Sequence, residues 1–201
     1  MTGVQTCALP ISTIGSDITA NGKGAKVTAK NLSKLDGDVT TDDDGSVELG
    51  FKEGASWTGD NGGNTTMSLS KGSWNGANTG KLNATLTNGT TWTGDSSGAG
   101  SMIKLDASTW NGANSGANAN VTLTNGASWS KGNTADGVTV KADKSTWTGA
   151  NGGAKANITL SNSASWTGTN TGNNATISLT DSSWSGDNSG AGLSLTANNS
   201  K

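Results

Sequence analysis

The stretch SASWTGTNTGNNATISLTDSSW, Ser163 to Trp184, contains one complete unit of a repeat that runs through most of the chain. The unit has a Trp, a Thr-Gly pair, a Gly/Asn-rich passage, an alternating Ile-Ser-Leu-Thr segment and a short connection to the next Trp. All eight Trp residues mark successive units, at steps of 17, 18, 18, 19, 18, 19 and 18 residues: Trp57, Trp74, Trp92, Trp110, Trp129, Trp147, Trp166 and Trp184. Such a fixed period predicts a repeat architecture.

Each unit contains four residues in which apolar and polar side chains alternate, the period-two pattern of a half-buried strand. No segment has a helical period, and the dense Gly disfavours helices. The predicted strands are Met67–Ser70, Ala84–Thr87, Ile103–Asp106, Val121–Thr124, Val138–Lys141, Ile158–Ser161, Ile177–Thr180 and Leu193–Thr196.

One such unit is too small to bury a core of its own, so the units must stack on one another. Stacking places the Trp and aliphatic residues in inward columns with a spacing of about 4.8 Å, and the Ser and Thr residues in outward ladders. Glycines relieve the corners where a positive φ is needed. The sequence therefore predicts an all-β fold, a single-stranded parallel β-helix (β-solenoid) of right-handed sense with about 18 residues per coil.

Two other architectures compete with this prediction. A string of hairpins is suggested by the Asn-Gly pairs in Thr87–Thr90 and Thr124–Ala127. The corresponding connections elsewhere differ in length and chemistry, which a tight hairpin tolerates only with a shift of register. A left-handed hexapeptide helix needs an apolar residue followed by Gly every six residues, and that pattern is absent.

The composition divides the chain into three parts. Residues 1–11, MTGVQTCALPI, hold the only Cys and the only Pro, and they resemble a translated short-read sequencing adapter. We expect this segment to be non-native. Residues 12–54 are degenerate solenoid repeats, and residues 55–201 are regular Trp-marked repeats that we expect to break off inside a unit, as in a fragment of a longer protein.

The degenerate part can still be aligned with the regular repeats. Lys26–Ala29 and Val47–Leu49 occupy strand positions, and Leu35 stands where later units have Trp. The acidic run Asp42–Asp44 falls at a loop position. It could ligate a hard cation such as Ca²⁺, but the spacing of a full ligand set is missing, so we expect a solvated loop.

The composition also excludes several classes of function. The chain has 13 Lys and 15 acidic residues, a net charge of −2, and no His, Arg or Tyr. The side chains favoured for acid–base catalysis, imidazole metal ligation and bidentate phosphate binding are therefore missing. No basic patch suits nucleic acid, and no apolar run reaches the ~20 residues of a membrane-spanning helix. The sequence offers no catalytic, cofactor-binding or metal-ligating residues, and we expect no enzyme and no cofactor.

The Ser-x-Trp-x-Gly and Ser-Trp-Thr-Gly motifs, the Asn/Gly-rich passage and the Val-x-Leu strand resemble the passenger regions of bacterial autotransporters. The resemblance covers about residues 55–200 and is one of repeat style. It implies an extracellular, surface-exposed, adhesin-like stalk on the bacterial cell surface. It also implies a C-terminal outer-membrane barrel elsewhere in the parent chain, and a host or environmental surface or glycan as partner.

Three functional hypotheses follow. The first is a structural or adhesive stalk without catalysis. The second is binding to an ordered surface such as ice, through outward hydroxyl pairs that Lys104, Asp106 and Lys141 interrupt. These pairs are Thr85/Thr87, Thr122/Thr124, Ser178/Thr180 and Ser194/Thr196.

The third hypothesis is carbohydrate binding on exposed Trp, or carbohydrate cleavage. We expect the Trp residues to lie in the core, because side chains at stacking distance would occlude one another. Asp60, Asp95 and Asp187 each follow a Trp by three residues and indicate a loop motif, not a catalytic pair.

Overall fold

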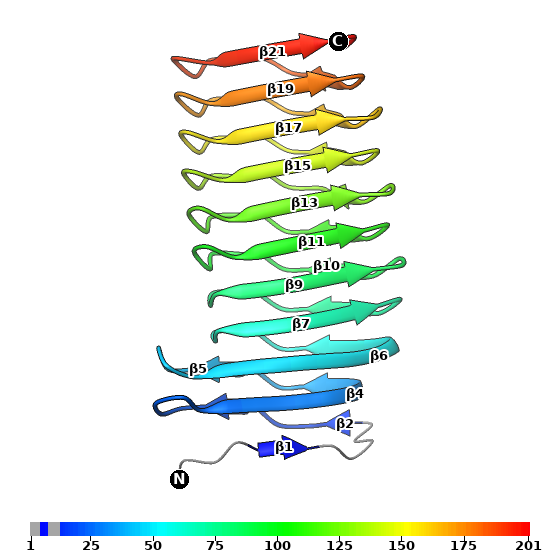
Figure 1. Cartoon of the computed structure of the whole chain (residues 1–201), viewed down its shortest axis with the longest axis vertical. Coiled ribbons are helices and arrows are strands. Elements are labelled where there is room, and N and C mark those ends of the chain that lie inside the picture. Colours follow the sequence, from blue (N-terminus) through cyan, green and yellow to red (C-terminus); the bar gives the residue numbers. More distant parts are fainter. Residues whose placement is uncertain (1–4, 8–12) are drawn as a thin grey trace.

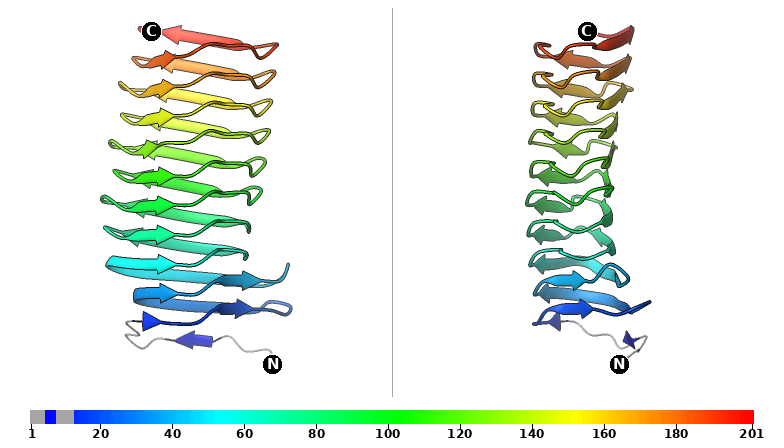
Figure 2. Two further views of the ribbon diagram at one scale, coloured as in Figure 1. Left: turned by 180° about the vertical axis from the view of Figure 1, so that it is seen from behind. Right: turned by 90° about the vertical axis from the view of Figure 1, so that its left-hand side faces the viewer.

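The computed structural model describes residues 5–7 and 13–201 and shows a parallel β-solenoid of about ten coils. Every strand pairing is parallel, and each strand pairs with its equivalents in the coils before and after it. The coils stack into an elongated rod with the strands across its axis (Figures 1 and 2). The all-β solenoid and its coil length are thus confirmed, and the hairpin alternative is wrong. The right-handed sense stays a prediction.

Each regular coil has one long strand and one short strand that carries the Trp. The long strands are β7 (Thr65–Ser70), β9 (Leu82–Thr87), β11 (Met102–Asp106), β13 (Asn120–Thr124), β15 (Thr139–Asp143), β17 (Asn157–Ser161), β19 (Thr176–Thr180) and β21 (Ser194–Asn198). The Trp strands are β8 (Ser73–Asn75), β10 (Thr91–Thr93), β12 (Thr109–Asn111), β14 (Ser128–Trp129), β16 (Thr146–Thr148), β18 (Ser165–Thr167) and β20 (Ser183–Ser185).

The first coils are built differently. Here β4 (Lys26–Asp36) and β6 (Ser46–Thr58) each run through the corner and serve as long strand and Trp strand at once. Their pairing sets Leu35 opposite Trp57, which confirms that Leu35 takes the Trp position. The remaining strands here are β1 (Gln5–Cys7), β2 (Thr13–Ile14), β3 (Ile18–Ala20) and β5 (Val39–Thr41). The predicted non-native segment lies mostly outside the described residues; its described part, β1, pairs with β4.

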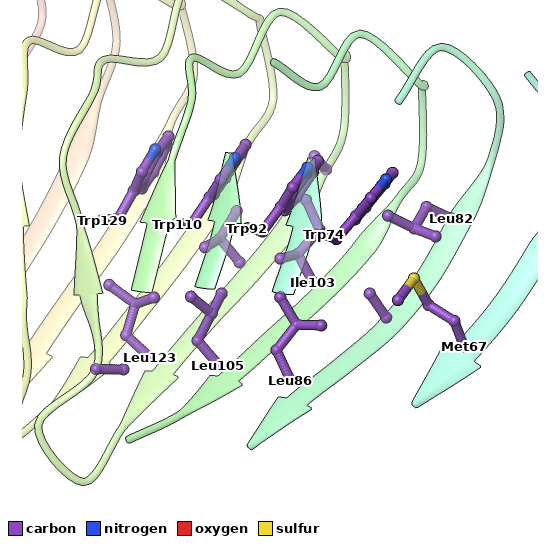
Figure 3. Close-up of a cluster of buried hydrophobic side chains, with 14 of the residues drawn as sticks. Met67, Trp74, Leu82, Leu86, Trp92, Ile103, Leu105, Trp110, Leu123 and Trp129 are labelled. Atoms are coloured by element: carbon purple, nitrogen blue, oxygen red, sulfur yellow. The ribbon is translucent and has the colours of Figure 1, made fainter. Parts of the chain in front are cut away.

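The core is a set of identical columns (Figure 3). Seven of the eight Trp side chains are at most 1% exposed, and Trp184 is half-buried. Successive indole rings stack with centroids 4.4–4.9 Å apart and planes within 6° of parallel. Leu86, Leu105 and Leu123 form an aliphatic column beside them. The prediction that Trp marks the core is confirmed.

Glycine sets how closely the coils approach. Each Trp donates its indole N–H to a carbonyl of the preceding coil, as Trp110 Nε1 does to Gly94 O at 2.9 Å. Gly112 follows Trp110 by two residues, and a Cβ built there would lie 1.8 Å from the same Gly94 oxygen. With the backbone as it lies at Gly112, a side chain would collide with this carbonyl. In the next coil Lys131 holds the equivalent position, two residues after Trp129, and the indole hydrogen bond from Trp129 Nε1 to Gly112 O is kept at 2.7 Å. Glycine at position 112 therefore fits the close approach of the two backbones in this coil, where a side chain would need a change of the local backbone path.

Asparagines form a second column, four residues after each Trp, which is buried in every coil before that of the exposed Asn188. Asn133 shows the pattern: its Nδ2 donates to Asn151 Oδ1 at 2.8 Å and to Ala135 O at 2.9 Å. Its Oδ1 in turn accepts from Asn114 Nδ2 at 2.8 Å. The amides therefore donate in one direction, each to the next coil. We call this column the asparagine ladder: Asn61, Asn78, Asn114, Asn133, Asn151, Asn170 and Asn188, with Ser96 in one coil.

The corner between long strand and Trp strand alternates between two lengths. Three-residue corners are Asn88–Thr90, Asn125–Ala127 and Asn162–Ala164, and two-residue corners are Lys71–Gly72, Ala107–Ser108, Lys144–Ser145 and Asp181–Ser182. The first residue of each corner has a left-handed φ between 48° and 58°. Asn88, Asn125 and Asn162 are spaced by 37 residues, so the true period of this part of the chain is two coils.

Two predicted strands are displaced by two residues. Val140, not Val138, pairs with Val121, and Leu195, not Leu193, pairs with Ile177. The reason is that Ala142 and Ala197 occupy the second aliphatic position, where the other coils have Leu. A smaller inward residue makes the alternating pattern fit equally well two residues earlier.

Candidate binding face

The outward surface of the long strands is the most regular exposed face of the molecule. Three coils present the same row of side chains, Asn then Thr then Thr or Ser, at a spacing of two coils. The Asn side chains are exposed, and the hydroxyls are half-buried. We call them the amide rows: Asn83/Thr85/Thr87, Asn120/Thr122/Thr124 and Asn157/Thr159/Ser161.

Rows of a different composition lie between the amide rows. Two contain Lys and Asp, and we call them the charged rows: Met102/Lys104/Asp106 and Thr139/Lys141/Asp143. Their lysines share one column and their aspartates the next. Lys141 shares a column with Lys104 because the observed register of β15 places it beside Thr122 and Thr159, two residues away from the predicted register. Opposite charges thus recur on the face every second coil.

The predicted hydroxyl pairs are only partly in line. Thr85/Thr87, Thr122/Thr124 and Ser178/Thr180 occupy the same two columns of the face. Ser194/Thr196 is displaced by one column, because Thr196 pairs with Ser178. The last pair therefore does not extend the array as predicted.

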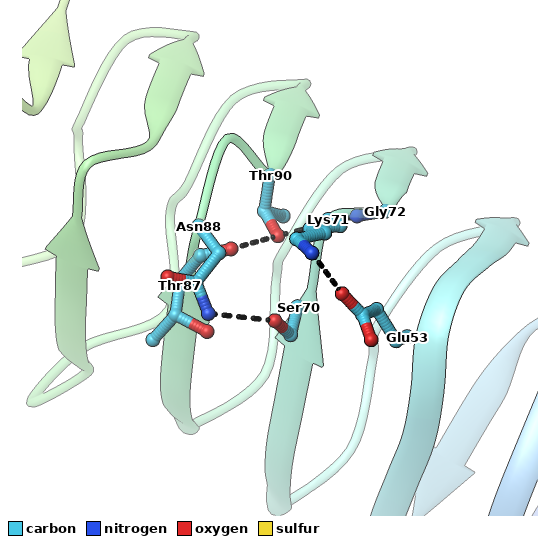
Figure 4. Close-up of polar contacts among 7 residues, drawn as sticks. All are labelled: Glu53, Ser70, Lys71, Gly72, Thr87, Asn88 and Thr90. Atoms are coloured by element: carbon cyan, nitrogen blue, oxygen red, sulfur yellow. Dashed lines mark hydrogen bonds and ion pairs between the residues drawn. The ribbon is translucent and has the colours of Figure 1, made fainter.

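The corners form a second exposed edge, held by polar contacts between coils (Figure 4). Asn88 Nδ2 donates to Ser70 Oγ at 3.0 Å in the preceding coil. The equivalent amides of Asn125 and Asn162 donate to Asp106 and Asp143 at 2.6 and 3.0 Å. Each three-residue corner is thus anchored to the last residue of the long strand in the preceding coil, directly before a two-residue corner.

The Asp residues that follow Trp by three serve the backbone. Asp60 Oδ1 accepts from Ala77 N at 2.7 Å, and Asp95 Oδ1 accepts from Ala113 N at 2.8 Å, each in the next coil. Both carboxylates are exposed. The predicted loop position is therefore confirmed for Asp60 and Asp95, and Asp187 lies at the same column position near the end of the solenoid.

The acidic run Asp42–Asp44 lies in an exposed turn, as expected. Asp42 accepts a backbone hydrogen bond from Gly22 through its carboxylate. No group of three or more metal-ligating side chains occurs among the residues that the structure describes. Over the same residues there is no helix long and apolar enough to cross a membrane.

One shallow depression of about 220 Å³ lies on the candidate face, around Met102. Met102 is an exposed large hydrophobic residue in the middle of this sheet, with 49% of its surface accessible; Leu195 on β21 is exposed to the same extent. It is flanked by Asn83 and Asn120 of the neighbouring amide rows. The depression brings together an apolar side chain, two amides and the ammonium of Lys104.

A repeat period of one coil predicts neither the amide rows nor the asparagine ladder. Both features have a signal in the sequence: Asn-[Ala/Val/Ile]-Thr-Leu recurs every 37 residues, and the ladder residue always follows Trp by four. In comparisons with known proteins, no family model matches the chain, and neither a curated protein nor a solved structure matches it. The autotransporter resemblance therefore rests on repeat style alone.

Proposed function

We propose that the chain is a rigid, non-catalytic spacer of a bacterial cell-surface protein, with an adhesive face on its long strands. The observation that carries the proposal is uniformity. From Ala55 to Thr180 the coils repeat the same buried columns, with Ser96 as the one exception in the asparagine ladder, and the same two kinds of corner, with no inserted loop. At ~4.8 Å per coil, about ten coils give a rod about 48 Å long. The autotransporter resemblance supports this extracellular location.

The chemistry of the amide rows supports a glycan on a host or environmental surface as the partner. Amide and hydroxyl groups donate and accept hydrogen bonds, and sugar hydroxyls need both. Three rows with the same amide and hydroxyl groups at two-coil spacing would let an extended glycan bind several times, and linked contacts raise the overall affinity. The proposal assigns no catalytic residue and no cofactor.

The test is binding of the purified chain to a glycan array and to intact cells. In the variant N83A/N120A/N157A, each lost hydrogen bond removes about 1 kcal/mol, so we expect binding to weaken at least tenfold. Asn75 and Asn111 are exposed on the Trp strands and provide the matched control N75A/N111A. Absence of binding by the wild type, or an equal loss in the control, would refute the adhesive part. Rod length and stiffness from small-angle scattering test the spacer part separately.

Binding to an ordered surface such as ice is a second candidate, supported by the recurring hydroxyls of the amide rows. The charged rows weigh against it, because ammonium and carboxylate groups interrupt the hydroxyl array in every second coil between Thr87 and Ser161. Ice recrystallisation inhibition by the wild-type chain would favour this candidate. If the ammonium groups are the obstacle, the double variant K104T/K141T should gain activity.

A further inference from the structure

The asparagine ladder is interrupted in one coil. Where the neighbouring coils have Asn78 and Asn114, the intervening coil has Ser96. Ser96 Oγ accepts from Asn78 Nδ2 at 3.0 Å, but Ser96 has no amide to donate to the following coil. As a result, Asn114 Oδ1 is buried and has no hydrogen-bond donor among the residues that the structure describes. An unpaired buried acceptor costs about 1–3 kcal/mol.

The start of the ladder shows how the protein handles such an acceptor elsewhere. Asn61 is the first amide, and its Oδ1 accepts from Thr65 Oγ1 at 2.6 Å. In the coil of Asn114, the residue in the same register column as Thr65 is Ala119, which has no hydroxyl. The chain therefore supplies a donor to Asn61 and none to Asn114.

We propose that one ordered water molecule binds between Ser96 and Asn114 and completes the ladder. A serine side chain has two heavy atoms fewer than an asparagine side chain. Their place can hold one water molecule, which occupies ~30 Å³ in the liquid. Ser96 Oγ then takes the place of the amide oxygen, and the water takes the place of the NH₂ group. Serine and water together reproduce the hydrogen-bonding pattern of an asparagine.

The water has the partners that a buried site needs. It donates to Asn114 Oδ1 and accepts from the Ser96 hydroxyl. Its second hydrogen points to Gly98 O, two residues after Ser96, just as Asn114 Nδ2 donates to Gly116 O at 3.2 Å. Three hydrogen bonds are typical of a buried water.

The surroundings of the gap are also unusually polar. Ser101 is fully buried in the same coil, at a column position where the adjacent coils have Leu82 and Ala119. Its hydroxyl donates to Gly98 O at 2.8 Å and accepts from Asn78 Nδ2 at 3.3 Å. This coil therefore contributes two buried hydroxyls, Ser96 and Ser101, next to the gap in the ladder, which suits a hydrated site.

The test compares the wild type with S96N, which should supply the missing amide and displace the water. Water-¹⁷O magnetic relaxation dispersion counts long-lived internal waters, and we expect one fewer per molecule in S96N. The control is S97N, the same substitution at the exposed neighbour. A crystal structure of the wild type should show the water within hydrogen-bond distance of Asn114 Oδ1.

A second variant keeps the test decisive if S96N fails to fold. A119S places a hydroxyl in the column position of Thr65, where it can donate to Asn114 Oδ1 directly and displace the water. Equal internal-water counts in the wild type and in each folded variant would overturn the proposal. So would a wild-type crystal structure with no solvent density between Ser96 and Asn114.

Discussion

Truncation of one Trp in the middle of the stack should cost far more stability than truncation of the terminal Trp. Trp110 is fully buried and stacks on two neighbours, at centroid distances of 4.7 and 4.8 Å. Trp184 is half-buried and stacks on one neighbour at 4.9 Å. Both indoles donate one hydrogen bond to a Gly carbonyl, at 2.9 and 2.8 Å. The loss of this hydrogen bond therefore contributes equally when either Trp is replaced by Ala.

The magnitude follows from burial and stacking. Replacing a buried Trp by Ala costs about 3–5 kcal/mol, and each aromatic contact is worth about 0.5–1.5 kcal/mol beyond its buried area. We expect W110A to lower the free energy of unfolding by about 5 kcal/mol. W184A, with one stacking contact and partial burial, should lower it by about 2 kcal/mol, by the same principles.

Urea unfolding followed by far-UV circular dichroism measures both changes without relying on the fluorescence of the Trp that is removed. The variant W110F keeps a stacked ring and loses the indole N–H, so it should retain most of the stability that W110A loses. Equal losses in W110A and W184A, or a loss below about 1 kcal/mol in W110A, would refute the view that the stack is a continuous core.

Three further predictions test other columns of the solenoid. G112A should destabilise the fold by several kcal/mol or prevent folding, because its Cβ meets Gly94 O at 1.8 Å. Thermal unfolding measures this loss of stability. The control is G15A, which should be near neutral because a Cβ at Gly15 meets nothing within 4 Å. A107G should raise the free energy of unfolding by about 0.5–1 kcal/mol, since Ala107 has a φ of 48° that glycine adopts without strain. Urea unfolding measures this gain, and a loss of stability would contradict the prediction. N151A should lower the free energy of unfolding by about 2–4 kcal/mol, because it leaves Asn133 Nδ2 and Asn170 Oδ1 without their partner in the ladder. Calorimetric unfolding measures this loss. A loss below about 1 kcal/mol would contradict a stabilising role of the ladder.

The Trp period determined the coil length and the core because a bulky aromatic at near-constant spacing has few alternative arrangements. The same logic identified Leu35, since the position requires bulk and not an indole. Strand register was less certain wherever the inward residue was small. Ala142 and Ala197 made two placements equally good, and only the pairing of neighbouring coils distinguished them.

The polar features were harder to predict for a physical reason. An asparagine in a Gly-rich passage ordinarily indicates an exposed turn, and burial becomes favourable only when the amides of adjacent coils satisfy one another. That condition depends on stacking, which a single unit does not reveal. The amide rows were missed because the period was taken as one coil, although the Asn-Gly pairs at Asn88 and Asn125 already marked every second corner.

The parallel pairing between consecutive coils has a mechanical consequence. Its backbone hydrogen bonds run along the axis of the rod, so a pull along that axis loads the coil-to-coil contacts in series and not in shear. We expect such a rod to open one coil at a time from a free end. Each event would release about 18 residues, or about 60 Å of chain at ~3.4 Å per residue. A stalk built in this way would yield stepwise under load and lengthen while its remaining coils stay folded.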